Sequence, residues 1–106
     1  MCLTKNGKVY SFGNNAHGEL GLGHRKGIHT PKRIPNLKDI AYISAGTFHS
    51  LCITKTGEMY GFGSNHLEKI GLEGDDDKPD PVLIPGLSNV TYVTTRCESS
   101  LVLSQD

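Results

Sequence analysis

The stretch TKNGKVYSFG, residues Thr4–Gly13, returns as TKTGEMYGFG at Thr54–Gly63, an offset of 50 residues. The offset continues without a gap through the rest of the sequence. It aligns asparagines, glycines, prolines and tyrosines of the two copies, namely Asn15 with Asn65, Gly21 with Gly71, Pro31 with Pro81, Pro35 with Pro85 and Tyr42 with Tyr92. A period of this length is typical of solenoids and propellers, so the helix or strand pattern inside one unit decides between them.

Short strand patterns bounded by turn residues make up each unit. Residues 39–45 alternate in polarity, residues 50–54 form an apolar run, and residues 58–62 alternate again before a glycine. Residues 81–84 are short and proline-flanked, as the outermost strand of a sheet should be. Four antiparallel strands of this size cannot bury both faces alone and must stack on neighbouring sheets. The sequence therefore predicts an all-β fold built from the four-stranded blades of a β-propeller.

A dense glycine pattern fills the first unit. It reads Gly7-x-Val9-Tyr10-x-Phe12-Gly13-x-Asn15-x-x-Gly18-Glu19-Leu20-Gly21-Leu22-Gly23, followed by Pro31, Ile43–Gly46 and His49–Leu51. This pattern resembles the repeat of the regulator-of-chromosome-condensation family, and the resemblance covers nearly the whole chain. The second unit departs from it in residues 67–70, at Arg96 in place of glycine, and at Ser99 in place of histidine.

The resemblance implies a propeller in which seven such blades close into a ring, so that no sheet edge is left open at the closure. Six positions are expected to serve the fold of the repeat, namely Gly13, Gly21, Gly46, His49, Gly63 and Gly71. The alignment predicts strands two to four of a blade in residues 1–38, a complete blade in 39–88 and the start of a third in 89–106. One complete blade between two incomplete ones predicts either a piece of a longer propeller or a chain that completes its blades by self-association.

The overall charge of the chain narrows the classes of partner. Eleven basic and eleven acidic side chains balance in 106 residues, and the sequence pI is near 7.0. This balance predicts neither a broad nucleic-acid surface nor binding to an anionic membrane. No apolar run approaches the roughly 20 residues of a membrane span, and the first residues lack the pattern of a signal peptide. The sequence predicts an intracellular protein, cytoplasmic, nuclear or both.

Cysteine and histidine spacing favours no chemical site. The three cysteines are odd in number and lack a CxxC pair, which argues against a disulfide framework. Cys2 and Cys52 are repeat equivalents, and we expect both to be small buried groups in neighbouring sheets. The five histidines lack the spacing of metal ligands. The sequence thus predicts no catalytic residue, no cofactor and no metal ion.

The loop between the third and fourth strands differs in charge between the two units. Its tip contains His24, Arg25 and Lys26 in the first unit and Asp75, Asp76 and Asp77 in the second. Solvated loop tips of this kind need no function, but two loops of opposite sign on one face could orient a charged partner. These six residues are the candidate partner-binding loops.

We therefore predict a protein-interaction scaffold that is not an enzyme. Two alternatives follow from the resemblance. The best-known member of the family promotes guanine-nucleotide exchange on the small GTPase Ran, a reaction driven by binding the nucleotide-free partner, so the chain could be part of such an exchange factor. It could instead be the regulatory propeller of a larger protein such as a ubiquitin ligase or a kinase.

Overall fold

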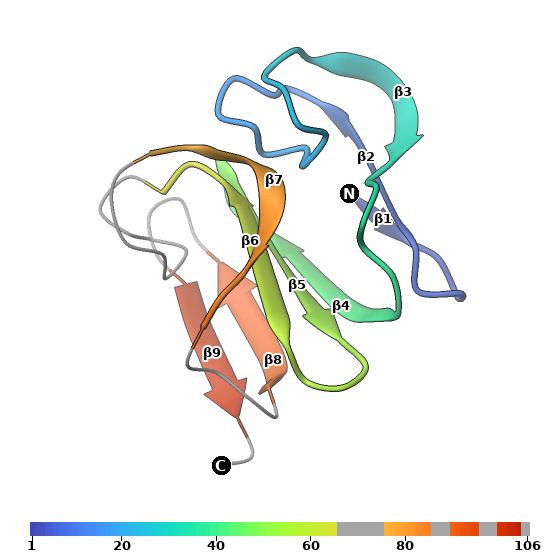
Figure 1. Ribbon diagram of the computed structural model, residues 1–106, viewed down its shortest axis with the longest axis vertical. Helices are drawn as coiled ribbons and strands as arrows, with labels where there is room; N and C mark the ends of the chain where they lie inside the picture. Colours follow the sequence, from blue (N-terminus) through green and yellow to red (C-terminus); the bar gives the residue numbers. More distant parts are fainter. Residues whose placement is uncertain (66–75, 86–89, 96–99, 105–106) are drawn as a thin grey trace.

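The computed structural model describes residues 1–65, 76–85 and 90, together with the backbone of 91–95 and 100–104, and this part consists of strands and turns. Three antiparallel sheets follow one another along the chain (Figure 1). Their strand orders are β1-β2-β3, β4-β5-β6-β7 and β8-β9. The strands are β1 (Cys2–Leu3), β2 (Val9–Gly13), β3 (Ile28–Arg33), β4 (Ile40–Ala45), β5 (His49–Thr54), β6 (Met59–Gly63), β7 (Lys78–Leu83), β8 (Val90–Thr95) and β9 (Ser100–Ser104). The prediction of an all-β fold with one complete blade between two incomplete ones is confirmed.

The repeat found in the sequence is also a repeat of strand pairing. Tyr10 of β2 lies opposite Arg33 of β3, and the equivalent Tyr60 of β6 lies opposite Leu83 of β7. Both pairs also shift register at equivalent places. The two sheets therefore share one backbone plan, and residues 50 apart occupy matching positions.

The outermost strand of the complete blade is β7, as its prolines predicted. It begins at Lys78, three residues before the predicted start at Pro81. A strand at the end of a sheet pairs on one side only, so Pro79 and Pro81 can lie within it although they lack an N–H donor. The exact unit limits at residues 38 and 88 remain predictions.

Side chains on β5 and β6 pack in two directions, which explains why these two strands are so thoroughly buried. Cys52 and Phe62 pack toward the first sheet in one core cluster, completed by Val9, Ile34, Leu37 and Ile40. Leu51, Ile53 and Met59 pack toward the third sheet in another, completed by Ile84 and Val90. Successive residues of a strand point to opposite faces, so a sheet between two others needs apolar residues on both.

The face of the first sheet that points away from the second is open among the described residues. Phe12 is the repeat equivalent of Phe62, yet Phe12 is 44% exposed whereas Phe62 is fully buried. Cys2 lies on the same face and is exposed, so the expectation of a buried Cys2 is wrong. Its counterpart Cys52 is buried because the first sheet covers it, and no described sheet covers Cys2 in the same way.

The two cysteines should differ sharply in reactivity. Desolvation by burial raises the pKa of the Cys52 thiol to about 12 from an ordinary 9.0. Because the thiolate is the nucleophile, we expect iodoacetamide at mildly alkaline pH to alkylate Cys2 and to spare Cys52 in the folded chain. Peptide mass spectrometry reads each site separately. Equal labelling of both in the absence of denaturant would contradict the packing described here.

The same pKa gives the direction of a pH effect on stability. The unfolded thiol ionises near pH 9.0, whereas the folded thiol resists ionisation until about pH 12. The stability that Cys52 contributes is therefore intact below pH 9 and is lost progressively as the pH rises from 9 toward 12.

No helix long and apolar enough to cross a lipid bilayer occurs among the described residues.

Candidate protein-binding surface

A buried asparagine organises the loop between β2 and β3. The Nδ2 amide of Asn15 donates to the carbonyl oxygens of His24 at 2.8 Å and Lys26 at 2.9 Å. Its Oδ1 accepts a hydrogen bond from the backbone N–H of Leu20 at 3.0 Å. One side chain thus fixes both ends of the loop, and the equivalent Asn65 of the second unit is also fully buried.

Two serines attach the middle of this loop to the sheets. Ser11 Oγ in β2 donates to the carbonyl of Leu20 at 2.7 Å, and Ser50 Oγ in β5 donates to the carbonyl of Glu19 at 2.9 Å. Glu19 is itself buried, and its Oε1 accepts a hydrogen bond from the backbone N–H of His17 at 2.8 Å. The sequence pattern included Glu19 and Ser50 without assigning them a role, and it left out Ser11, because a hydroxyl or carboxylate that anchors a loop gives no spacing signal of its own.

The three basic residues at the tip of this loop have different roles. His24 Nδ1 accepts a hydrogen bond from the backbone N–H of Lys26 at 3.0 Å, so the imidazole helps to shape the turn. Arg25 and Lys26 extend into solvent, the Arg25 side chain being 60% exposed. The tip is therefore a fixed turn that presents two cations.

The oppositely charged loops of the two units meet each other. Asp77 Oδ2 lies 3.4 Å from a terminal guanidinium nitrogen of Arg25 and 3.2 Å from His17 Nδ1. The His17 ring in turn packs against Phe48, with 4.8 Å between ring centroids. The opposite charges predicted for the two loops thus partly pair with each other and join the loops. Asp76 stays exposed beside this contact, and Asp75 lies outside the described residues.

Backbone contacts close the same junction. The N–H of Gly23 donates to the carbonyl of Pro79 at 3.0 Å. Gly18 lies so close to Pro79 that a Cβ placed on it would be 2.5 Å from the Pro79 Cα. Loop 14–27 of the first sheet and the start of β7 in the second are therefore held together by charge, by a hydrogen bond and by close packing.

The positions expected to serve the repeat differ in what they do. Gly13, Gly21 and Gly63 adopt positive φ angles of 113°, 70° and 98°. The N–H of Gly46 donates to the carbonyl of His49 at 2.8 Å, closing the turn between β4 and β5, and the His49 side chain is fully buried. Gly71 lies outside the described residues.

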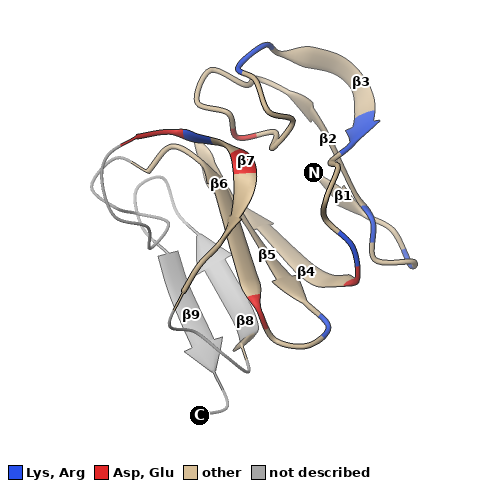
Figure 2. Cartoon of the chain, in the orientation of Figure 1, with Lys and Arg blue, Asp and Glu red and all other residues tan. Residues whose placement is uncertain are grey.

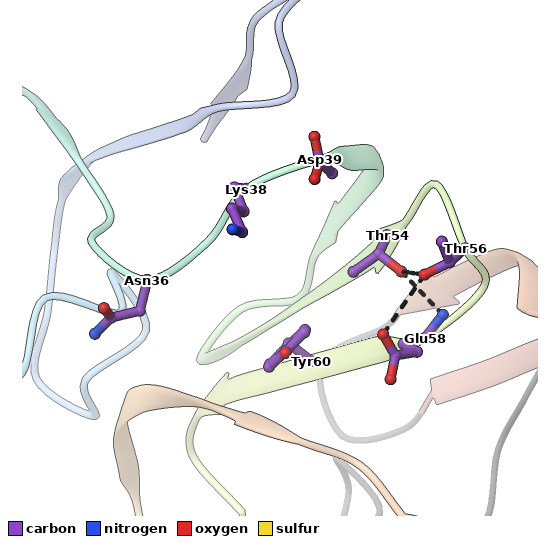
Figure 3. A pocket seen from close by; sticks show the side chains of 7 residues that line it. All are labelled: Asn36, Lys38, Asp39, Thr54, Thr56, Glu58 and Tyr60. Carbon is purple, nitrogen blue, oxygen red and sulfur yellow. Dashed lines mark hydrogen bonds between the residues drawn. The ribbon is translucent and has the colours of Figure 1, made fainter.

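A pocket of about 190 Å³ lies on a different side of the same two sheets, between the segment after β3 and the β5–β6 turn (Figure 3). Thr54 Oγ1 lies 3.0 Å from Thr56 Oγ1 and accepts a hydrogen bond from the backbone N–H of Glu58 at 3.0 Å. The pocket is lined by Asn36, Lys38, Asp39, Thr54, Thr56, Glu58 and Tyr60. The threonine hydroxyls are thus used to shape the turn.

Within the part of the chain that the structure describes, no three histidine, cysteine, aspartate or glutamate side chains gather closely enough to hold a metal ion. The buried Asn15, Ser11 and Ser50 all hydrogen-bond to backbone groups of one loop. These hydrogen bonds hold loop 14–27 in one conformation, so that it forms an ordered surface across the first two blades.

Known proteins share this sequence pattern. Residues 6–53 and 40–67 match two family models, each described as the regulator of chromosome condensation (RCC1) repeat. Among curated proteins, the serine/threonine-protein kinase Nek8 of Danio rerio is 33% identical over 46 residues, which are 43% of this chain and 7% of the kinase. The E3 ubiquitin-protein ligase HERC2 of Mus musculus is 42% identical over 43 residues, 41% of this chain and 1% of the ligase.

Solved structures share the fold. Prp20p from Saccharomyces cerevisiae superimposes with a TM-score of 0.82 at 22% identity, over 97% of this chain and 29% of that structure. The chain thus spans less than a third of that propeller and a smaller share of the two curated relatives. Together with the two matched repeats and the shared strand register of the first and second sheets, this places the chain in the RCC1 repeat family.

Proposed function

We propose that this chain is a section of an RCC1-type propeller that binds a protein partner and carries no catalytic centre of its own. The observation that supports this best is the junction between the loops, where Arg25 and His17 of one blade contact Asp77 of the next. Loops that are already fixed lose little conformational freedom on binding, which favours their use in recognition. Lys26 and Asp76, exposed on either side of the junction, are the residues that we expect to contact the partner.

A second candidate function is suggested by the relatives. In both the kinase Nek8 and the ligase HERC2, the matched segment is a small share of the protein, 7% and 1%. We propose that this chain is likewise a small part of a larger intracellular protein, in which it serves as a regulatory propeller section. Its enzymatic domain would then lie outside these 106 residues.

A small GTPase is one class of partner to consider. The structural study of Prp20p concerns its binding to Gsp1p and histones. Exchange on a Ran-type GTPase can be tested directly by following the release of fluorescent GDP with and without this chain. Faster release would replace the scaffold proposal by the exchange-factor alternative, and an unchanged rate would leave the scaffold proposal in place.

The scaffold proposal predicts that exchanging two exposed charges alters partner binding without altering the fold. In the double variant Lys26→Asp and Asp76→Lys the net charge is unchanged and the Arg25–Asp77 contact is kept. We expect the amount of each protein that cross-links to the wild-type chain to fall about tenfold or more, since the two reversed charges disfavour the complex. Quantitative mass spectrometry after cross-linking measures this.

A matched control is the variant Lys55→Asp and Glu58→Lys, which exchanges charges at the β5–β6 turn. It should retain the wild-type partners, and circular dichroism should be the same for all three proteins. If the Lys26 and Asp76 exchange variant recovers the same partners in the same amounts, the loops are not the binding surface.

A further inference from the structure

The zero net charge of the chain conceals a strong separation of charge between its repeats. Residues 1–38 contain seven of the eleven basic side chains and one of the eleven acidic ones, Glu19, which is buried. Their formal charge is therefore +6, and residues 39–106 carry the balancing −6. The seven cations are Lys5, Lys8, Arg25, Lys26, Lys32, Arg33 and Lys38, and among the described residues only Arg25 of these forms an ion pair.

The second unit serves as an internal reference for what the fold requires. Because the two sheets share one strand register, residues 50 apart occupy equivalent positions. At four of those positions the second unit has Glu58 for Lys8, Asp76 for Lys26, Val82 for Lys32 and Leu83 for Arg33, whereas Lys5 corresponds to Lys55. The second blade thus folds with carboxylates or apolar side chains at these four sites, and strand pairing does not explain Lys8, Lys26, Lys32 or Arg33.

Four of these cations lie along the outer strand of the first sheet. Arg25 and Lys26 lie in the loop before β3, and Lys32 and Arg33 form its end, as the blue segments on either side of β3 show (Figure 2). All four are exposed. We call these residues the basic rim.

The shape of the basic rim distinguishes between classes of anionic partner. Lys32 and Arg33 are consecutive strand residues, so their side chains point to opposite faces of the sheet. A nucleic-acid duplex lying on one face would contact only one of them. Since β3 is the last strand of its sheet and is exposed from His29 to Arg33, a partner strand alongside it would reach both cations.

We propose that the basic rim binds an extended acidic segment of a partner protein, which lies along the outer edge of β3. Backbone groups of the strand edge supply pairing, and Lys32 and Arg33 contact carboxylates on the two faces of the added strand. Pro31 removes one donor from this edge, so pairing is partial and charge contributes much of the affinity. This inference rests on the proposed function, because it specifies the partner class for the binding scaffold.

The test uses the chain with a fluorescent oligoglutamate peptide, and anisotropy measures binding over a series of salt concentrations. We expect binding that weakens as salt rises, because exposed charges are screened. The variant Lys32→Glu and Arg33→Glu should bind about tenfold or more weakly, since two attractions become repulsions. The matched control Lys55→Glu and Lys78→Glu changes the net charge equally on the second sheet and should bind like the wild type.

Three results would overturn the proposal. The first is no peptide binding by the wild type at low salt. The second is an equal loss in the control variant, which would indicate a general charge effect. The third is single-stranded DNA of matched charge binding more tightly at the same residues, which would make the basic rim a nucleic-acid surface. Circular dichroism checks each variant, and the single neutral variant Lys32→Gln replaces the double one if that fails to fold. In each of these cases, the scaffold proposal would still be supported if the Lys26→Asp and Asp76→Lys variant loses the proteins that cross-link to the wild-type chain.

Discussion

Replacing Gly18 by alanine should destabilise the chain by about 3 to 5 kcal/mol, or abolish its cooperative unfolding transition. Gly18 has a φ of 79°, which costs an alanine about 1 to 2 kcal/mol. In addition, the new Cβ would lie 2.5 Å from the Pro79 Cα and 3.0 Å from the Pro79 nitrogen. Because backbone atoms cannot rotate away, the loop of the first blade must separate from β7 of the second. Urea denaturation followed by circular dichroism measures the change.

Gly23 provides the matched control for this prediction. Its φ of 86° is close to that of Gly18, so the backbone cost of alanine is similar. A Cβ there would first meet the Asp80 carboxylate oxygen at 3.0 Å, and that side chain can move. We expect Gly23→Ala to cost about 1 to 2 kcal/mol. If the two variants lose the same stability, close packing at Gly18 contributes little to joining the blades.

The spacing of glycines and prolines predicted the fold well for a physical reason. Turns with positive φ and outer strands that tolerate proline both restrict residue type strongly, so Gly63 and Pro81 mark their structural roles in the sequence itself. The alternation in residues 58–62 predicted a strand, but it did not show that both faces of this strand are buried, with Met59 packing toward one sheet and Phe62 toward another.

The candidate site was harder to predict. Sequence reasoning found Arg25 and Asp77 as opposite charges on equivalent loops, but it could not show that they contact each other across two blades. That contact depends on how the sheets stack, which no local pattern specifies. The +6 charge of the first unit was available in the sequence and was hidden by counting over the whole chain. Counting by repeat would have revealed it.

Truncating Phe62 to alanine should cost about 3 to 5 kcal/mol in the free energy of unfolding. Phe62 is fully buried and packs with Val9 and Ile34 between the first two sheets. Gly21 makes room for it, since a Cβ on Gly21 would lie 2.9 Å from the ring. Removing the ring therefore leaves a cavity at the place where one blade rests on the next. Chemical denaturation again provides the measurement.

The repeat equivalent Phe12 is the control, and its result bears on the proposed function. Because 44% of Phe12 is exposed, its truncation should cost at most about 1 kcal/mol in the free energy of unfolding. A cost close to that of Phe62→Ala would mean that another copy of the chain covers Phe12 in solution, through self-association. Light scattering checks this, because self-association raises the mass of the particles formed by the purified chain. Protection of Cys2 from alkylation would accompany a covered face, because Cys2 and Phe12 share it.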